Sequence, residues 1–325
     1  MSELDLISVG RVNMDLYAQQ AGVAFNAVNG WDAMVGGSPT NVALAGARLG
    51  LRTAVFTAVG DDLVGDWVMR SLQNEGVETR FVARKRGLHT SLALRAQLPP
   101  DHPLAFYRHD PADIYLTATE AAAVPVDRAR ALLVSADALA RGSTPEACWS
   151  LIAAAQDSTR VTYLDLDLRD VNWPDLDVYA TTVAEVVDHV DVVLGTEAEF
   201  STLLRLGPES SRSTVSVVRE RPARRPGQVS IVKQGERGAT VVSGGQALFV
   251  DCFPVTEASS IGAGDSFAAG LIRTRLSGAD WPSACEFATA CAAITVSRLG
   301  CSSGFPCADE VEHFLETHSL ASSPV

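Results

Sequence analysis

Short runs of apolar residues recur along the chain and are separated by stretches in which apolar residues return every three or four positions. The runs are rich in Val, Ile and Leu, which is typical of strands that are buried on both faces. We expect six such strands, at residues 4–9, 53–59, 131–135, 161–166, 191–194 and 229–233. Because helical stretches separate them, the pattern predicts an α/β fold with a mostly parallel sheet and helices on both faces.

Capping residues and glycines predict where several helices begin and end. Ser38 as N-cap with Pro39 in the first turn predicts the start of one helix, and Gly50 predicts its end. A second helix is expected over residues 62–75, with Gly76 closing it. A third is expected to follow a glycine-rich turn and to run to about residue 276.

Two stretches, residues 12–35 and 89–108, depart from this rhythm. Both alternate apolar and polar positions, and both are too short to contain a crossover helix. The pattern predicts a small antiparallel sheet apart from the main one. Such a sheet would be either a lid over a site or an ordinary pair of surface hairpins.

Composition narrows the class of protein. The chain has 325 residues, a net charge of -13 and 47% hydrophobic residues, which excludes a fibrous or low-complexity protein. The excess of acidic residues argues against nucleic acid as a partner, since affinity there depends on Lys and Arg. The first residues lack a secretion signal, and no apolar run reaches the roughly 18 residues of a membrane span. We therefore expect a cytoplasmic protein with reduced thiols and no membrane contact.

The strongest candidate for chemistry is the stretch SSIGAGDSF at residues 259–267. Gly262 and Gly264 allow a tight turn, after which the free amides of a helix N-terminus converge on one spot and form an anion hole. Asp265 has the wrong charge to bind phosphate, but it could accept a proton from a hydroxyl that attacks phosphate. The alternative is an ordinary capped helix with Asp at its N-terminus, and this stretch alone does not decide between them.

A second glycine cluster, GGSPTN at residues 36–41, opens the first predicted helix. Its backbone and the Asn41 amide could approach a polyhydroxylated ligand closely. No GxGxxG motif follows the first strand and no GxxxxGK[ST] motif occurs, so neither a dinucleotide fold nor a P-loop is supported. The cluster is therefore a second polar site of another kind.

Together these residues resemble the PfkB, or ribokinase-like, family of sugar kinases. Residues 36–41 with Gly50 and Gly60 resemble its first signature, and GAGD at 262–265 resembles its second. Further matches lie in family order along almost the whole chain, at residues 10, 15, 60–65, 165–169, 199 and 233–238. The resemblance implies a single domain, 1–325, with a three-layer ribokinase-like α/β fold and a lid built from about 12–35 and 89–108.

Within this family the chain is similar to the 5-dehydro-2-deoxygluconokinase group of myo-inositol catabolism. The similar stretches are GR at 10–11, YRHDPAD at 107–113, DLDLR at 165–169 and GTEAEF at 195–200. They imply ATP- and Mg²⁺-dependent phosphorylation of the terminal hydroxyl of a keto-deoxy sugar acid, with 5-dehydro-2-deoxy-D-gluconate as the expected substrate. The alternatives are a kinase for 2-keto-3-deoxygluconate, fructose or ribose, and a non-catalytic sugar-binding regulator.

The resemblance also implies roles for individual residues. The catalytic residues would be Asp265, as the base, and Gly262, Ala263 and Gly264, whose amides would stabilise the transferring phosphoryl group. The sugar would be held by Asp15, Gly36, Gly37, Asn41, Arg108, Asp165 and Arg169. The nucleotide would lie by Thr196, Lys233, Gly235 and Gly238, and Glu199 would organise Mg²⁺ through water.

Several of these roles have simpler alternatives. Arg108 could instead form a surface ion pair with Asp110 or Asp113, Asp15 could be a turn acceptor, and Glu199 could be a carboxylate of a first helical turn. Arg11, a further candidate for binding an acid sugar, and Lys233 could each be solvent contacts at strand ends. The segment 212–225, which contains five arginines, could rim an anion site or form a solvated loop.

Two departures from the family pattern affect the expected cofactors. Ser259, Ser260 and Ile261 stand where the family usually has Asp-Thr-Thr, so dependence on a monovalent cation is doubtful. Thr196 replaces the Asn of the Asn-x-x-Glu motif, while Glu199 keeps the carboxylate. Because lid strands in this fold often pair between subunits, a homodimer through the lid is also expected.

Overall fold

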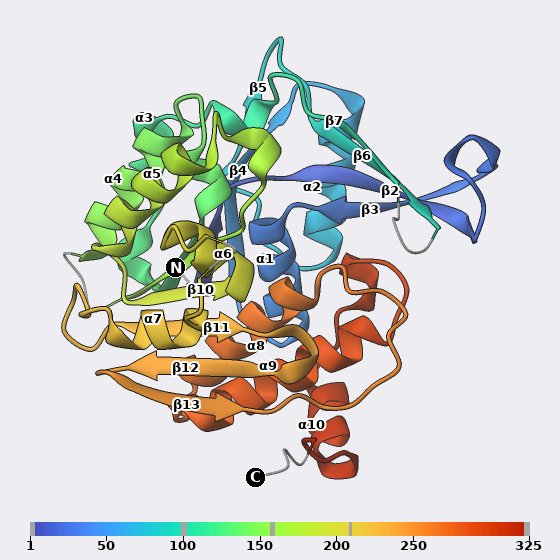
Figure 1. Ribbon diagram of the computed structural model, residues 1–325. Helices are drawn as coiled ribbons and strands as arrows, with labels where there is room; N and C mark the ends of the chain where they lie inside the picture. The colour runs from blue at the N-terminus through green and yellow to red at the C-terminus, as the bar shows by residue number, and fades with distance from the viewer. Residues whose placement is uncertain (1–3, 99–102, 157–159, 208–209, 322–325) are drawn as a thin grey trace.

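The computed structural model describes residues 4–98, 103–156, 160–207 and 210–321. It consists of a large twisted sheet with helices on both faces and a smaller sheet that projects from one side (Figure 1). The strands are β1 Leu4–Val9, β2 Asn13–Ala21, β3 Trp31–Gly36, β4 Thr53–Gly60, β5 Val82–Lys85, β6 Ser91–Gln97, β7 Leu104–Tyr107, β8 Ala129–Ser135, β9 Val161–Asp165, β10 Val192–Thr196, β11 Val229–Lys233, β12 Ala239–Ser243 and β13 Gln246–Val250. The helices are α1 Ser38–Arg48, α2 Leu63–Asn74, α3 Ala118–Ala121, α4 Thr144–Gln156, α5 Leu176–Val187, α6 Glu197–Leu203, α7 Thr214–Glu220, α8 Ala263–Leu276, α9 Trp281–Val296 and α10 Ala308–Thr317.

The large sheet has the strand order β13-β12-β11-β10-β9-β8-β1-β4-β5. All neighbours from β5 to β11 are parallel, whereas β12 and β13 add an antiparallel hairpin at one edge. The predicted parallel sheet is therefore confirmed, and all six predicted strands are present. The carboxyl ends of β9, β10 and β11 lie side by side, which brings Asp165, Thr196 and Lys233 to the same edge of the sheet.

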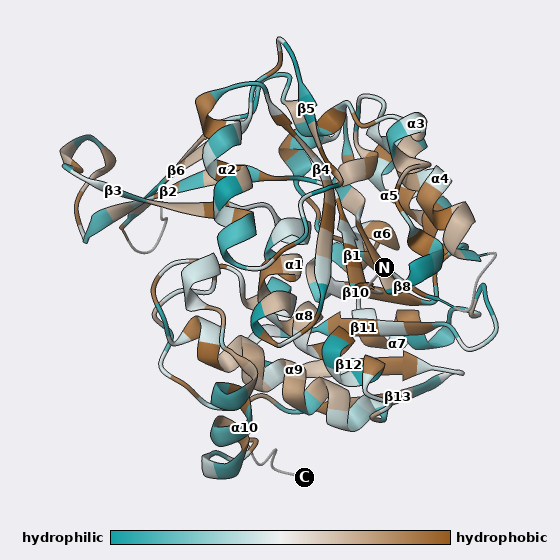
Figure 2. Ribbon diagram, turned by 180° about the vertical axis from the view of Figure 1, so that it is seen from behind, coloured by the Kyte–Doolittle hydropathy of each residue, from teal (hydrophilic) through white to brown (hydrophobic). Residues whose placement is uncertain are grey.

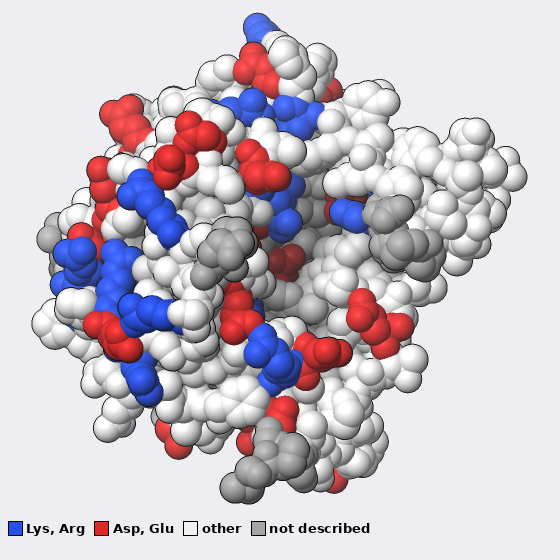
Figure 3. Space-filling model, viewed as in Figure 1, with Lys and Arg blue, Asp and Glu red and all other residues white. Residues whose placement is uncertain are grey.

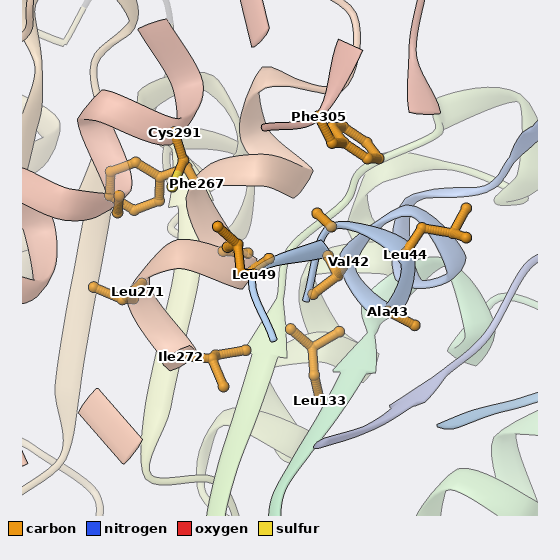
Figure 4. Packing of buried hydrophobic residues seen from close by; sticks show 14 of the residues in the cluster. Val42, Ala43, Leu44, Leu49, Leu133, Phe267, Leu271, Ile272, Cys291 and Phe305 are labelled. Carbon is orange, nitrogen blue, oxygen red and sulfur yellow. The ribbon is translucent and has the colours of Figure 1, made fainter. Parts of the chain in front are cut away.

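Two hydrophobic cores, one on each face of the sheet, form the interfaces of the three layers. One core packs α1, α2, α8, α9 and α10 against the sheet, and the other packs α4, α5, α6 and α7 against the opposite face. In the first, Val42 of α1, Leu133 of β8 and Ile272 of α8 lie close together (Figure 4). The central strands are strongly hydrophobic along their lengths, as expected for strands covered on both faces (Figure 2).

The smaller sheet, which we call the lid, consists of β2, β3, β6 and β7 in the order β3-β2-β6-β7. The two predicted segments supply these strands, and each forms an antiparallel hairpin. The hairpins join through β2 and β6, which pair in parallel. This parallel pair is possible because α1, β4, α2 and β5 lie between the two hairpins in sequence and return the chain to the same side.

Some local features differ from the sequence-based expectations. Strands β5, β12 and β13 were not expected, and the N-cap of α1 is Gly37, with Ser38 as its first helical residue. Gly37 is the cap because its carbonyl already accepts a hydrogen bond from the Asn41 amide, and the Ser38 hydroxyl is engaged by a residue from α8, described below. No helix in the described segments combines the length and apolarity needed to cross a membrane.

Candidate active site

A cavity of about 560 Å³ lies between the lid and the carboxyl ends of the central strands. Figure 3 shows it as a hollow with acidic and basic side chains inside. Most of the residues expected to bind or react line it, namely Asp15, Gly37, Asn41, Asp165, Arg169, Thr196, Glu199, Lys233, Gly262, Gly264 and Asp265. The sheet, the N-termini of α1, α6 and α8, and the lid thus bring segments from distant parts of the chain to one place.

Asp265 lies in the first turn of α8, directly after the glycine turn. Gly262 is the N-cap of this helix and has φ of +81°, a conformation that favours glycine. The Asp265 carboxylate accepts hydrogen bonds from the Ser38 hydroxyl at 2.6 Å and from the Asn41 amide at 2.8 Å. Burial raises the pKa of Asp265 above its usual value, although these two hydrogen bonds oppose the shift. The carboxylate is therefore fixed in position and is a stronger base than an exposed aspartate.

Two glycines of the first cluster leave room for other parts of the site. A Cβ on Gly36 would lie 2.3 Å from a carboxylate oxygen of Asp15, and one on Gly37 would lie 2.3 Å from the carbonyl oxygen of Arg11. Gly37 also has φ of +103°. Glycine at both positions therefore lets the junction of β3 and α1 lie close against β2 and the residues just before it.

Alternating carboxylates and cations form the floor of the cavity at the ends of β9 and β11. Lys233 lies 3.4 Å from Asp165, and Arg169 lies 2.9 Å from Asp167. Burial alone would raise the pKa of Asp167, but Arg169 and Arg11 outweigh it and hold that pKa below the usual range. The pKa of Asp165 is raised, mainly by burial. Burial lowers the pKa of Lys233, but Asp165 and Glu199 outweigh it and keep the ammonium charged.

Thr196 and Glu199 form a capping box at the start of α6. The Thr196 hydroxyl accepts a hydrogen bond from the Glu199 amide, while the Glu199 carboxylate accepts one from the Thr196 amide. The other Glu199 oxygen accepts a hydrogen bond from the Leu168 amide at 3.2 Å. Glu199 thus lies in a first helical turn and also lines the cavity, so its expected role at Mg²⁺ stays a prediction.

On the lid, Asn13, Asp15 and Tyr17 of β2 face the cavity together with Ala93 and Arg95 of β6. The Asp15 carboxylate accepts a hydrogen bond from the Asn13 side chain. Burial raises the pKa of Asp15 to about 6, and Arg11 and Arg95 limit this rise. Asp15 lies within the regular strand β2 and not in a turn, so the turn-acceptor alternative is wrong.

Arg108 does not line this cavity. Its guanidinium contacts Asp113 at 2.8 Å and Ser91 at 3.0 Å, and only 6% of its side chain is exposed. It borders a neighbouring hollow that shares Phe106 and Val171 with the cavity. An ion pair with Asp113 on the surface was the alternative to sugar binding; the structure contains this pair, but it is buried, so the surface location is wrong.

Other candidate residues take up intermediate positions. Arg11 is buried, lies 3.5 Å from Asp137 and lines the cavity, so an exposed strand-end charge is the wrong description. Lys233 is likewise paired within the cavity wall. Gly36, Ala263, Gly235 and Gly238 are not lining residues, although Gly36 and Ala263 adjoin residues that are. Gly235 and Gly238 follow β11 in the turn to β12, both with positive φ.

The arginine-rich segment 212–225 lies away from the cavity. Arg212 pairs with Glu220, Arg224 pairs with Asp188, and Arg225 pairs with Asp191. These ion pairs lie around α7, and Arg219, Arg221 and Arg224 line a separate pocket of about 310 Å³. The segment therefore does not rim the cavity described above.

Comparison with known proteins agrees with this geometry. The model of the pfkB family of carbohydrate kinases matches residues 3–307. The chain belongs to this family. A relative from Geobacillus kaustophilus named 5-dehydro-2-deoxygluconokinase is 32% identical over 98% of this chain and 96% of its own length. One of the same name from Bacillus subtilis is 29% identical, and 97% of each chain is covered.

Solved structures show the same fold at lower identity. A fructokinase with bound ATP from Xylella fastidiosa superposes with a TM-score of 0.83 at 23% identity and covers 96% of this chain and 98% of its own. A fructokinase from Vibrio cholerae, solved with fructose, ADP and calcium, gives 0.82 at 23% identity, with 97% and 100% covered. The three-layer ribokinase-like fold expected from the sequence is therefore confirmed.

Several residues of the pfkB kinase cavity were not among the candidates. The missed residues are Ser38, whose hydroxyl donates a hydrogen bond to Asp265, and Cys301, whose thiol accepts one from the Asn41 amide. Tyr17, Phe106 and Arg95, which line the cavity on the lid side, were also missed. Ser38 lies inside the GGSPTN signature, so its position at a helix N-terminus was a usable signal. Arg95 lies in a period-two strand pattern that does not reveal which of its faces meets the cavity.

Proposed function

We propose that this pfkB kinase transfers the γ-phosphoryl group of ATP to the terminal hydroxyl of 5-dehydro-2-deoxy-D-gluconate and yields its 6-phosphate. The relatives that carry this activity in their names are about 30% identical over nearly the whole chain. ATP as the donor is supported by family membership and by the ATP named with one structural neighbour.

The observation that carries the proposal is the environment of Asp265. Its carboxylate is held by Ser38 and Asn41 at the N-terminus of α8, inside a cavity that polar lid residues such as Asp15 also line. A hydroxyl bound beside Asp265 would lose its proton to the carboxylate as it attacks the phosphorus. The raised pKa of Asp265 brings its basicity closer to the working pH.

The other half of the reaction needs positive charge near the phosphates. The amides of Gly264 and Asp265 have no acceptor within their helix, because the first four N–H groups of a helix never do. They carry the positive end of the helix dipole and would stabilise the transferring phosphoryl group. A Cβ on Gly264 would lie 3.4 Å from the Lys233 ammonium, so that charge adjoins the same turn.

The residues present fit a magnesium ion that arrives with the nucleotide. In the described parts of the chain no three His, Cys, Asp or Glu side chains are grouped to hold a metal by themselves. Mg²⁺ usually keeps several waters and binds through one or two carboxylates and substrate phosphates. Glu199 would act through water, since both of its oxygens already accept backbone hydrogen bonds. Bound magnesium would neutralise phosphate charge.

The preference for an acid sugar is supported by the cations around the cavity. A carboxylate substrate beside ATP, in a protein of net charge -13, needs local positive charge. Arg169 is half exposed on the cavity wall, so it can approach a ligand while it keeps Asp167 as a partner. A neutral sugar would not need such a cation.

Release of ADP with ATP and Mg²⁺ over a panel of acceptors tests the proposal. The panel contains 5-dehydro-2-deoxygluconate, 2-keto-3-deoxygluconate, fructose and ribose. We expect the highest kcat/KM for the first. Preference for fructose or ribose would contradict the acid substrate but leave a sugar kinase, and sugar binding without turnover would favour the regulator.

Two further features belong to this proposal. We expect no dependence on a monovalent cation, because Ser259, Ser260 and Ile261 offer no carboxylate for one; equal activity in sodium and potassium buffers would agree.

We also expect a homodimer through the lid, whose edge strand β7 exposes Leu104 and Tyr107. Light scattering before and after a Tyr107→Glu substitution would test it.

A further inference from the structure

Arg95 extends from the lid into the cavity. It lies on β6 opposite Tyr17 of β2, on the same face of the lid as Asp15 and Ala93. Along β6 it is two residues, or about 7 Å, further than Ala93 from the end where β2 adjoins the Gly36 turn. Ser38 and Asn41, which hold the catalytic carboxylate, follow that turn. Arg95 therefore lies toward the end of the cavity away from Asp265.

Within the described residues, no carboxylate lies close enough to pair with the Arg95 guanidinium. Its side chain takes part in no hydrogen bond or ion pair with these residues, whereas the other cavity cations each have a carboxylate partner within 4 Å. Its field nevertheless reaches into the site, because it opposes the rise in the pKa values of Asp15 and Tyr17. A partly buried guanidinium of this kind is free to bind an anion.

Arg108, the lid cation that the sequence favoured, is not free in this way. It is nearly fully buried, and its guanidinium is engaged by Asp113 and Ser91. Asp113 in turn accepts a hydrogen bond from the Val12 amide at 3.1 Å, which connects the pair to the start of the lid. Removing Arg108 from this pair to bind substrate would leave Asp113 buried without its cation.

We infer that Arg95 recognises the carboxylate of the substrate and that Arg108 has a structural role. This inference rests on the proposed function, since it assigns one end of the acid sugar. The terminal hydroxyl and the carboxylate are at opposite ends of the substrate's carbon chain. With the hydroxyl at Asp265, the carboxylate would meet the Arg95 fork through two parallel N–H···O bonds.

The test compares two acceptors in wild type and variants. One is 5-dehydro-2-deoxygluconate, and the other is its neutral counterpart, with a hydroxymethyl group in place of the carboxylate. We expect Arg95→Gln to raise KM for the acid about 10- to 150-fold, the range for a charged hydrogen bond, with little change in kcat. KM for the neutral acceptor should stay within about twofold, and Arg95→Lys should restore part of the affinity for the acid.

Arg84→Gln is the matched control, because Arg84 pairs with Asp66 outside the cavity and its loss should change neither KM. An unchanged KM for the acid in Arg95→Gln, or an equal rise for both acceptors, would overturn the inference. The wild-type enzyme is measured first on both acceptors. If it shows no preference for the acid, the proposed substrate fails; if it does and the variant keeps that preference, only the role of Arg95 fails.

Discussion

The floor and the lid of the cavity differ in how they use charge. On the floor, Lys233 and Arg169 each face a buried carboxylate at a strand end. On the lid, apolar side chains such as Phe106 and Leu104 line the cavity together with a few polar groups, and the Arg95 guanidinium has no carboxylate partner among the described residues. The charges of the floor are thus preorganised before any ligand binds, which suits phosphoryl transfer. The lid instead offers polar groups whose binding partners would be supplied by the sugar.

This difference between floor and lid indicates which residues can change substrate preference without changing the chemical step. Floor residues lie at the ends of strands packed on both faces, so their geometry depends on two cores. Lid residues lie on a four-stranded sheet that projects from the body (Figure 1). Substitutions on the floor should therefore alter kcat, and those on the lid should alter KM.

The largest expected effect is that of Asp265→Asn, at the start of α8 beside the floor. Loss of the base should lower kcat by about 10²- to 10⁴-fold, as measured by ADP release, with sugar binding retained in calorimetry. Because the pKa of Asp265 is raised by burial, its ionised form destabilises the folded protein above the usual aspartate pKa. The variant should therefore unfold at a higher temperature than wild type at neutral pH. This difference in unfolding temperature should vanish in acid, where residue 265 is neutral in both proteins. Residual kcat near the wild-type value would show that Asp265 is not the base.

The next effect tests whether the buried cation behind the lid is structural. Arg108→Gln leaves Asp113 buried without a partner and should cost about 3–5 kcal/mol of unfolding free energy, measured in urea. The double variant Arg108→Gln with Asp113→Asn should recover part of the lost unfolding free energy. KM for the acid sugar, measured on the folded fraction, should change much less than in Arg95→Gln. A selective rise in KM for the acid sugar without a loss of stability would show that Arg108 binds the substrate.

A smaller effect is expected for Ser38→Ala, which removes one of the two hydrogen bonds to Asp265. The carboxylate would keep the Asn41 bond but lose orientation, so kcat should fall about tenfold, equivalent to one hydrogen bond of about 1.5 kcal/mol. Ser38→Thr should retain most of the activity. Equal loss in both variants would point to packing in α1 as the cause.

The smallest effect is a pH dependence that separates lid from floor. Asp15 has a pKa of about 6, so its carboxylate, an acceptor for sugar hydroxyls, is lost as the pH falls through that value. We expect KM for the sugar to rise severalfold below pH 6, and Asp15→Asn to remove this dependence and raise KM at all pH values. kcat should also fall in acid as Asp265 is protonated, in wild type and in Asp15→Asn alike. A KM that is flat with pH in wild type would contradict the assignment of Asp15.

Much of the fold was predictable because buried parallel strands leave a strong local pattern. β1 and β11 match the predicted ranges in full, and the glycine turn before α8 is recognisable from spacing alone. The β12–β13 hairpin was missed although Gly244 and Gly245 separate two β-prone runs, a pair typical of hairpins. Its outer strand even contains the apolar run ALFV at 247–250, so this hairpin was within reach of the sequence pattern.

The site was less predictable where tertiary contacts decide. Residues in the signatures, such as Asn41 and Asp265, were found because fixed spacing specifies a helix start. The orientation of Arg95 depends on which face of the lid is turned inward, and the pairing of Arg108 with Asp113 depends on the bend that follows β7. The bond of Ser38 to Asp265 could not be predicted from a local pattern because the two residues are 227 positions apart in the chain.

That same distance has a consequence for synthesis in the cell. The Ser38–Asp265 bond joins α1, made early by the ribosome, to α8, made near the end. A growing chain can assemble β1, β4 and both lid hairpins long before its catalytic carboxylate exists. Nascent or truncated chains should therefore be unable to consume ATP, and the enzyme becomes active only when translation is almost complete.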